Sequence, residues 1–371
     1  MDAARLKANF AHVAMHGDEV PLFFYSDLFI RNPQVRDLFP VSMAAQRDHL
    51  MAALGRIVAS VDRAGEITGF LQGLGRDHRK FGVLAEHYDA LGTSLLATIA
   101  YFSGDTWTPD LAADWRQAYE LIAGIMRRAA ADDEAEHPPY WTGTVLSCER
   151  PAFDVSVLRV RPDPPLGYLP GQSVAVEVPS RPRLWRYYSI ANAPRPDGTL
   201  EFHVRMVDGG AVSMALTREL PAGAQLRLGP PVGALTLDAA SGRDILLIAG
   251  STGLAPLKAL AEQVAGLASP PRVHLFFGAR TAEGLYDLPG LLRLAREHPW
   301  LTVVPVVADG RRSPGETGRL ADVVARHGDW SARDAYLAGP SEMVREVQER
   351  LVAAGMPGRQ VHVEDFGWSE P

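Results

Sequence analysis

Residues 244 to 260 read Asp244-Ile-Leu-Leu-Ile-Ala-Gly-Ser-Thr-Gly-Leu-Ala-Pro-Leu-Lys-Ala-Leu260. The apolar run Ile245–Ala249 predicts a buried parallel strand, and Gly250 to Gly253 predict a turn into a helix opened by Pro256. Glycines let a backbone approach an anion closely, and a helix N-terminus presents free N–H groups at the positive end of its dipole. The stretch therefore predicts a phosphate-binding turn.

The region from residue 243 onward alternates strands with helices about every thirty residues, which predicts a doubly wound α/β parallel sheet. Near-continuous apolar strands are typical of such sheets because both faces are covered. The expected strands are Ile245–Ala249, Val273–Gly278, Thr302–Val307, Ala335–Ala338 and Val361–Val363.

Between residues 140 and 237 the apolar period changes to two. Short alternating strands separated by Pro/Gly turns predict an antiparallel β-barrel. The clearest expected strands are Phe153–Val160, Gln172–Val178 and Leu200–Met206.

The first 136 residues predict an all-α region. Segments 20–29 and 46–54 carry apolar residues at three- and four-residue spacing, and Asn32-Pro33 and Phe39-Pro40 interrupt helices. A long final helix is expected over Trp115–Ala131. The charged, proline-ended run 131–139 is expected to be a linker.

Composition narrows the functional class. The 371 residues carry a net charge of -7, which argues against a general nucleic-acid binder. The chain has no run of about twenty apolar residues and no signal-like N-terminus, so we expect a cytoplasmic location without membrane insertion. The single cysteine, Cys148, cannot supply an iron–sulfur or zinc cluster, and we interpret it as a structural thiol. Any electron path must then use organic cofactors or haem.

A second candidate for anion binding lies upstream at Arg186-Tyr187-Tyr188-Ser189. Arg186 offers a permanent charge with forked donors, Tyr188 a ring to cover a flat heterocycle, and Ser189 a small donor. A surface arginine on an aromatic strand is the alternative. Downstream, Gly209-Gly210-Ala211-Val212-Ser213 is expected to open a helix and to offer N–H groups and a hydroxyl to a pyrophosphate.

Residues 140–371 resemble the ferredoxin-NADP reductase superfamily, because R-x-Y-S, G-G-x-x-S, G-x-x-G-x-x-P and a terminal acidic-Phe segment occur in family order. The resemblance implies that Glu364 and Phe366 close over the flavin and that Gly339-Pro340 approaches the nicotinamide. It implies an FAD site at Arg186, Tyr188, Ser189, Gly210 and Ser213, and a nucleotide site at Gly250, Thr252, Gly253 and Pro256. Ala338 departs from the family, which often has a cysteine there.

Arg280 follows the second expected strand of the parallel sheet and could meet a 2′-phosphate or be a solvated loop residue. No second basic residue accompanies it in 281–284, which slightly favours NADH over NADPH.

Residues 1–136 resemble the globin domain of flavohaemoglobins, through Phe24-Tyr25-x-x-x-Phe29-x-x-Asn32-Pro33, Gln46-Arg47-x-x-Leu50 and the segment from His78 to Leu96. A lone histidine such as His78 is usually solvated or a satisfied core residue. The resemblance implies instead that it ligates haem iron, with Tyr88 beside it. It implies that Tyr25 donates a hydrogen bond to bound oxygen with Gln46 nearby, that Leu50 lies over the iron and that Phe39 packs on the porphyrin. His49 is an alternative residue for the oxygen-binding side of the haem, although it lies three residues after Gln46.

One further departure concerns the carboxylate that joins the ligand histidine in well-studied flavohaemoglobins. The matching position on the last helix is Ala130, and Glu134 lies about one turn beyond it. A carboxylate beside the imidazole raises its basicity, so turnover of oxygen is expected to be weaker.

Together the resemblances imply a haem-binding globin domain (1–136), an FAD-binding β-barrel (137–239) and an NAD(P)-binding α/β domain (240–371). The implied cofactors are haem b, FAD and NAD(P)H, and the implied activity is a nitric oxide dioxygenase acting on O2 and NO, with no protein partner required. Two alternatives remain open: a globin that senses or stores O2 and reduces itself, and a flavin reductase with a haem-free helical domain.

Overall fold

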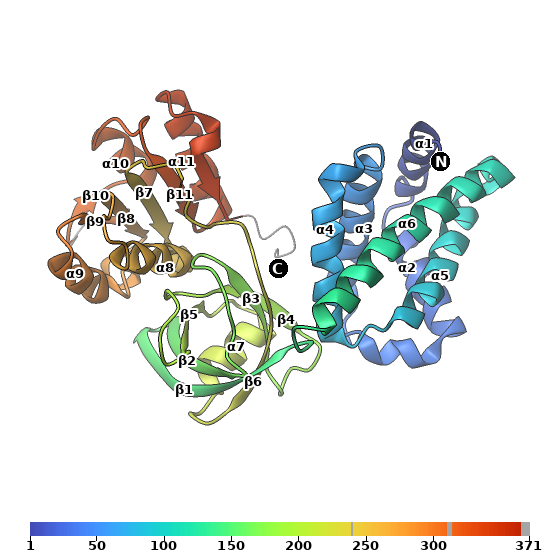
Figure 1. The fold of residues 1–371 in the computed structure, drawn as a ribbon, viewed down its shortest axis with the longest axis horizontal. Helices are drawn as coiled ribbons and strands as arrows, with labels where there is room; N and C mark the ends of the chain where they lie inside the picture. Colours follow the sequence, from blue (N-terminus) through green and yellow to red (C-terminus); the bar gives the residue numbers. More distant parts are fainter. Residues whose placement is uncertain (239, 310–313, 365–371) are drawn as a thin grey trace. The chain divides into compact units, whose positions relative to one another are not determined.

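The computed structural model describes residues 1–238, 240–309 and 314–364. The chain folds as two compact units (Figure 1). Of the described residues, 1–140 and 182–184 form one unit, and 141–181 and 185–364 form the other. The domain limits expected at residues 136 and 239 stay predictions.

The first unit is helical, as the spacing of its apolar residues predicts. Its helices are α1 (Ala3–Ala14), α2 (Glu19–Arg31), α3 (Ala44–Ala59), α4 (Ala64–His78), α5 (Ala85–Ser103) and α6 (Pro109–Glu134), with a 3₁₀ turn over Pro33–Leu38. Thr108 caps α6 by accepting from the N–H of Leu111 (3.2 Å), and Pro109 follows at the first helical position.

Two glycines set how closely these helices cross. A Cβ on Gly75 of α4 would lie 2.4 Å from the carbonyl oxygen of Met126 on α6, and one on Gly92 of α5 would lie 2.4 Å from the ring of Tyr119. Only glycine permits these approaches. Helix α6 therefore packs against both α4, which ends at His78, and α5.

The second unit begins with an antiparallel six-stranded sheet in the order β4-β3-β6-β1-β2-β5. A bridge between Ile190 and Phe202 joins its two ends, which closes the barrel as expected. Helix α7 (Ala211–Arg218) follows β5. The strands are β1 (Trp141–Ala152), β2 (Val155–Asp163), β3 (Ser173–Glu177), β4 (Trp185–Ser189), β5 (Leu200–Arg205) and β6 (Gln225–Val232).

The rest of the second unit is a parallel six-stranded sheet in the order β10-β9-β8-β7-β11-β12. Side chains of β7 alternate between two cores: Leu247 packs with α8 on one face, and Leu246 packs with α10 and α11 on the other. The sheet is therefore doubly wound. Its elements are β7 (Ile245–Gly250), α8 (Leu254–Ala265), β8 (Val273–Ala279), α9 (Leu288–Glu297), β9 (Leu301–Val307), β10 (Glu316–Thr317), α10 (Leu320–Arg326), β11 (Asp334–Ala338), α11 (Ser341–Ala353) and β12 (Val361–Val363).

Strand order reverses between β7 and β11, since β8 and β9 continue to one side of β7 and β12 to the other. In open α/β sheets, ligands bind beyond the carboxyl ends of the strands at such a switch point. The turns after β7 and β11 lie at that position.

Three expected boundaries were wrong. The charged residues 131–134 continue α6, because a solvated helix face tolerates charge, so the non-helical linker starts later. Helix α8 begins at Leu254, after a 3₁₀ turn over Ser251–Gly253, so Pro256 is its third residue. Phe153 lies in the turn between β1 and β2 and is 82 % exposed. Among the described residues, no helix is long and apolar enough to cross a membrane.

Candidate functional site

His78 is the last residue of α4, and its ring is held by the backbone of its own helix. Nδ1 lies 2.7 Å from the carbonyl oxygen of Leu74. A carbonyl oxygen can only accept, so Nδ1 carries the proton and Nε2 keeps its lone pair. Burial lowers the pKa of His78, which favours this neutral form. The unprotonated Nε2 is the atom that could hold a metal.

Tyr25, on α2, is the candidate donor. It is only 5 % exposed, among the rings of Phe29 and Phe39. Its hydroxyl donates to the backbone oxygen of Gln46 at 3.3 Å, a long hydrogen bond. Burial raises the pKa of the phenol well above its usual range, so Tyr25 is a neutral donor throughout the physiological range. The structure thus brings Tyr25, Phe39 and Gln46 together.

The apolar residues around Tyr25 are compatible with a flat hydrophobic cofactor. Few residues of α3 are fully buried, although the helix is rich in apolar side chains. The half-buried side chains that pack against this cluster include Phe39, Met43, Leu50, Met51 and Leu54. Together with an imidazole that offers a free Nε2, this residue set fits haem. The individual roles given to His78, Tyr25, Gln46, Leu50 and Phe39 stay predictions.

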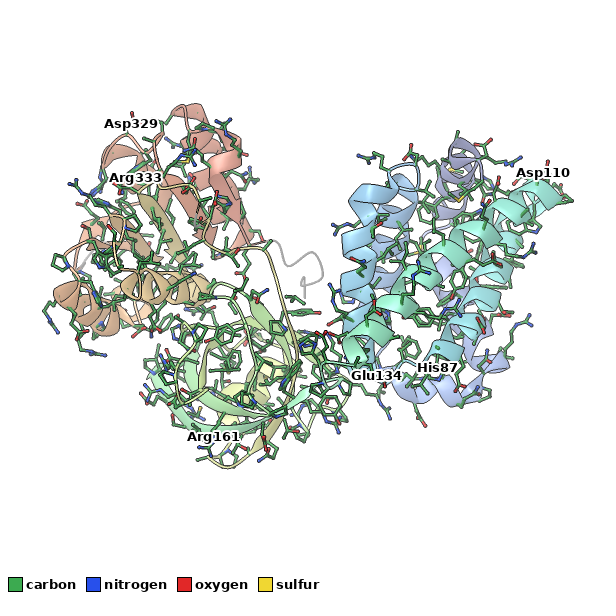
Figure 2. The ribbon with its side chains drawn as sticks, viewed as in Figure 1. His87, Asp110, Glu134, Arg161, Asp329 and Arg333 are labelled. Atoms are coloured by element: carbon green, nitrogen blue, oxygen red, sulfur yellow. The ribbon has the colours of Figure 1, made fainter. Side chains whose placement is uncertain are left out.

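No carboxylate reaches the His78 ring among the described contacts. Ala130 of α6 is half-buried and Glu134 is exposed at the end of α6 (Figure 2). The Tyr88 hydroxyl is buried without a partner among the described residues, while Tyr119 donates to the backbone oxygen of Tyr88. His78 and Tyr88 are therefore not joined by a carboxylate on α6.

The acidic residue of α6 that does contact this region is Asp133, which the sequence did not single out. It accepts from Arg79, the residue after His78, and lies 3.0 Å from Nδ1 of His137. Arg79 also donates to the carbonyl oxygen of His137 (2.8 Å). Asp133 thus ties the end of α4 to the chain that follows α6.

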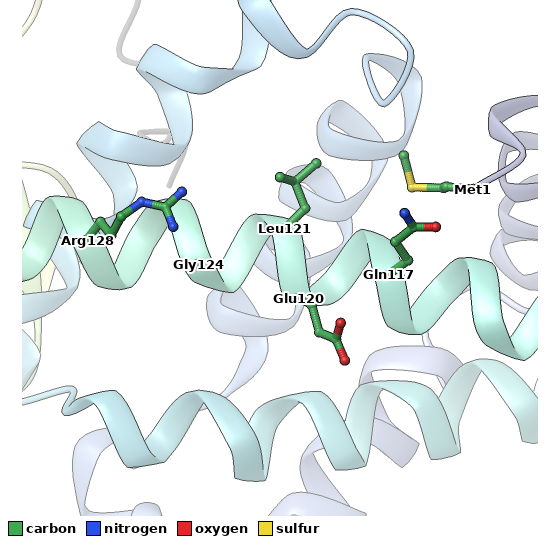
Figure 3. A pocket seen from close by; sticks show the side chains of 6 residues that line it. All are labelled: Met1, Gln117, Glu120, Leu121, Gly124 and Arg128. Atoms are coloured by element: carbon green, nitrogen blue, oxygen red, sulfur yellow. The ribbon is translucent and has the colours of Figure 1, made fainter.

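A surface pocket of about 390 Å³ lies along α6 (Figure 3). Gln117, Leu121, Gly124 and Arg128 line it at helical spacing, together with Glu120 and Met1. None of the residues predicted to hold haem lines this pocket, so it is separate from the candidate haem site.

In the second unit, Ser189 at the end of β4 is part of a polar group in which Ser173 is buried and Ser189 and Glu364 are half-buried. The hydroxyls of Ser189 and Ser173 both donate to Oε1 of Glu364, at 2.8 Å and 3.0 Å. Burial raises the pKa of Glu364 to about 7, against the opposing effect of the two hydrogen bonds. A carboxyl group that titrates near neutrality can give or take a proton under physiological conditions. Phe366 lies outside the described residues.

The other residues predicted to bind FAD lie at the surface of the barrel or just below it. Tyr188 is half-buried, and burial raises its pKa. Arg186 is exposed, and its Nη1 donates to the carbonyl oxygen of Trp185 (2.9 Å). An exposed guanidinium beside a half-buried ring fits an anionic, aromatic cofactor.

The turn before α7 explains Gly210 and Ser213. A Cβ on Gly210 would lie 2.5 Å from Oγ of Ser213. That oxygen accepts from the N–H of Val207 (3.2 Å) and donates to the carbonyl oxygen of Gly210 (3.0 Å). The hydroxyl expected to face a pyrophosphate is thus engaged within its own turn, which leaves the N–H groups at the start of α7 as the candidate donors.

The predicted nucleotide loop lies against the end of β11. A Cβ on Gly253 would lie 2.3 Å from the backbone of Ala338, and one on Gly250 would lie 2.6 Å from Cε of Met343. Both glycines therefore have a packing role: they let the turn after β7 lie close to the turn after β11. Thr252 is half-buried between them, and Pro256 is buried in the first turn of α8, where its missing N–H costs nothing. Arg280 is exposed.

Comparison with known proteins gives three family matches in chain order. Residues 22–126 match the Globin family, residues 145–237 the oxidoreductase FAD-binding domain and residues 247–349 the oxidoreductase NAD-binding domain. The helical region and the two parts of the reductase-like region thus match three separate families.

Some similar proteins cover nearly the whole chain, and others cover its reductase-like part. A flavohemoprotein of Bordetella pertussis is 29% identical over 394 residues, which span 98% of this chain and 97% of the relative. A ferredoxin–NAD(P)(+) reductase component of naphthalene 1,2-dioxygenase/salicylate 5-hydroxylase systems from Ralstonia sp is 32% identical over 241 residues, 64% of this chain and 72% of the relative. The solved flavohemoglobin of Malassezia yamatoensis, with bound FAD and heme, shares the fold with a TM-score of 0.81 at 20% identity, covering 98% of both chains.

Proposed function

We propose that this chain, which belongs to the flavohaemoprotein family, uses NAD(P)H to drive the oxidation of nitric oxide by O2 to nitrate. The balanced reaction consumes two NO, two O2 and one NAD(P)H, and yields two nitrate ions, NAD(P)⁺ and one proton. The three matched domains, with haem, FAD and NAD(P)H as their cofactors, support an oxidoreductase of this kind.

When bound, FAD would supply the conversion of two-electron to one-electron chemistry, and haem would supply a one-electron centre with a site for O2. The loop Gly250–Gly253 and the first turn of α8 would hold the nucleotide phosphates. Arg186, Tyr188, Ser189 and the start of α7 would hold FAD. Glu364, held by two serines, would give or take a proton beside that site.

In the helical unit, His78 would bind iron through Nε2, because Leu74 holds its Nδ1–H. Tyr25 would donate its phenol hydrogen to O2 as substrate and so stabilise the negative charge that develops during reduction. The long hydrogen bond to Gln46 is easily exchanged for a shorter one. The apolar surroundings would exclude water and strengthen that interaction.

One observation carries the proposal: a buried, neutral tyrosine with a weak existing hydrogen bond lies within the apolar cluster of a helical unit whose α4 ends in a histidine with a free Nε2. Such a donor is what a small, polarisable substrate such as O2 requires.

The test is consumption of NO in air by full-length protein supplied with NADH. We expect many turnovers per haem. We expect Tyr25→Phe to lower the rate by roughly ten- to a hundredfold, because a hydrogen bond to a charged group is worth about 1.5–3 kcal/mol. Tyr101→Phe, which changes an exposed tyrosine on α5, is the matched control and should not differ from wild type. Equal rates for all three proteins would overturn the assigned role of Tyr25.

A second candidate function is a globin that binds O2 or another ligand and is kept reduced by its own reductase. The contact of His78 with a backbone carbonyl, in place of a carboxylate, favours it, because a neutral partner makes the imidazole a weaker electron donor. In that case NO would be lost once per haem and NADH would not be consumed further.

A further inference from the structure

One face of β5 makes three polar contacts with the parallel-sheet half of the second unit. Glu201, His203 and Arg205 alternate along the strand and so point to the same side. Glu201 accepts from Lys258 of α8 (2.8 Å), His203 contacts Tyr286 (2.8 Å), and Arg205 donates to Oγ of Ser251 (2.7 Å). The barrel therefore touches both the predicted nucleotide loop and the helix that follows it.

The hydrogen bonds at this contact have one consistent direction. We call Glu201, His203, Lys258, Tyr286 and Asp287 the Glu201 cluster. Glu201 is an acceptor only, so Nε2 of His203, 3.1 Å away, carries the proton and Nδ1 accepts from the Tyr286 hydroxyl. Lys258 donates to Asp287 as well (2.9 Å). Two of these bonds join the barrel to the parallel-sheet half: Glu201 with Lys258, and His203 with Tyr286.

The pKa shifts of Glu201, His203 and Lys258 favour an ionised carboxylate, a neutral imidazole and a charged amine. Burial would raise the pKa of Glu201, but hydrogen bonding to His203 and the charge of Lys258 outweigh it and hold the pKa well below its usual range. Burial lowers the pKa of His203. Asp287 and Glu201 raise the pKa of Lys258 despite its burial. Glu201 and His203 are only 3 % and 4 % exposed. Loss of the Tyr286 hydroxyl would leave Nδ1 of His203 buried without its donor, whereas Glu201 also contacts Arg195 and Arg159, at 3.5 and 3.6 Å.

A cavity of about 470 Å³ adjoins the cluster, with Arg159 of β2 and Gly290 and Leu294 of α9 in its wall. Barrel side chains also pack on the apolar core of the parallel-sheet half, with Val155 within it and Val157 against it. The polar bonds therefore add a specific orientation to an apolar contact. Ser251 has φ 55, a left-handed conformation that is uncommon outside glycine. Its contact with Arg205 supports that conformation.

We propose that the Glu201 cluster is a positioning network that fixes α8, and with it the loop Gly250–Gly253, against the barrel, and so sets the rate of hydride transfer from NAD(P)H to FAD. In that step the nucleotide loses two electrons and one proton as hydride and the flavin gains them. The inference rests on the proposed function only in assuming that the barrel binds FAD and the parallel-sheet half binds NAD(P)H. None of the cluster residues is assigned a contact with either ligand.

The experiment is anaerobic stopped-flow reduction of the flavin by NADH in the full-length, haem- and FAD-loaded protein, at increasing NADH. For Tyr286→Phe, which removes one hydroxyl and keeps the ring, we expect the limiting rate to fall roughly tenfold, because small misplacement of reacting groups is costly. The half-saturating NADH concentration should stay within about twofold, since no nucleotide contact is lost. His203→Phe should behave likewise, and His203→Gln, which can still donate to Glu201, should recover part of the rate.

Tyr336→Phe is the control, because it also removes a buried tyrosine hydroxyl in the same half, the one that accepts from the N–H of Asp238 (3.1 Å). It should reduce flavin at the wild-type rate. A limiting rate for Tyr286→Phe equal to that of Tyr336→Phe would overturn the proposal, and this comparison stands even where His203→Phe does not fold. NO and O2 are absent from the assay, so its failure is distinct from failure of the proposed dioxygenase activity.

Discussion

Nδ1 of His78 lies 2.7 Å from the carbonyl oxygen of Leu74, four residues earlier in α4. This contact fixes which ring nitrogen is protonated and leaves Nε2 with a free lone pair, which is the atom that we propose binds iron. It also occupies the atom that a carboxylate from α6 would otherwise contact. The imidazole is therefore oriented by its own helix, independently of α6.

The first prediction concerns haem binding. His78→Ala should abolish the Soret band of the purified protein and leave the flavin spectrum intact, because the nitrogen that would bind iron is lost. His87→Ala is the matched control: His87 of α5 accepts from the N–H of Leu84 through Nδ1 (2.9 Å) and has no assigned role in haem binding (Figure 2). A Soret band of full intensity in His78→Ala would refute the assignment.

The second prediction concerns the nucleotide loop. Gly253→Ala places a Cβ 2.3 Å from the backbone of Ala338, so the loop must move away from β11. We expect the NADH concentration needed for half-maximal flavin reduction to rise by about tenfold or more, a loss of roughly 1.4 kcal/mol of binding, while FAD content is unchanged. Gly266→Ala, where the nearest contact would be 3.4 Å, should bind NADH as wild type does. Equal NADH dependence in both variants would contradict the role of the loop.

The third prediction concerns Glu364, whose pKa of about 7 lies above the ordinary value of 4.5 because the group is buried. Between these pH values the folded state binds more protons than the unfolded state, so this group's contribution to stability is full below pH 4.5 and is lost as pH rises through 7. Relative to Glu364→Gln, wild-type protein should lose up to about 3 kcal/mol of unfolding free energy over that range.

Urea unfolding of both proteins, followed between pH 4.5 and 7.5, measures this difference, and subtraction of the variant removes the contributions of His203 and other groups. A difference between the two proteins that does not change with pH would mean that Glu364 keeps an ordinary pKa.

The fourth prediction concerns Asp133, whose carboxylate pairs with Arg79 where both side chains are about one-tenth exposed. Asp133→Asn leaves a guanidinium largely buried without its counter-charge, which should cost about 3 kcal/mol of unfolding free energy in the helical unit. Asp132→Asn, at the exposed neighbouring position, should cost less than about 0.5 kcal/mol. Denaturant unfolding followed by far-UV circular dichroism measures the free energy of unfolding of both variants. Equal values would show that the ion pair between Asp133 and Arg79 does not stabilise the fold.

The architecture of the second unit could be predicted because its signals are local. Runs such as Ile245–Ala249 are apolar at every position, and the parallel strands were each located within one or two residues. Strand β10 was missed, since its two residues leave no period to detect. The turn after β7 lies where the glycines predicted it. The packing of Gly253 against Ala338 could not be predicted, because it involves a strand about 85 residues away, which periodicity cannot indicate.

The candidate haem site could be predicted only in part. Resemblance indicated His78 and Tyr25, and the structure adds their hydrogen bonds, which depend on helix geometry. Asp133 was missed because its position in a charged run is typical of a solvated helix face. Glu201 and His203 were missed for a related reason: polar residues at alternate positions of a strand predict a solvent-facing side, whereas here that side meets α8 and Tyr286.

Transfer of electrons from NADH through flavin to haem within one chain is the central claim, and anaerobic mixing of the oxidised protein with NADH tests it most directly. Flavin and Soret absorbance are recorded together after mixing. We predict that the flavin bleaches and the Soret band then shifts to the ferrous position within seconds, without any added carrier protein. A flavin that stays reduced for minutes beside ferric haem would contradict the account.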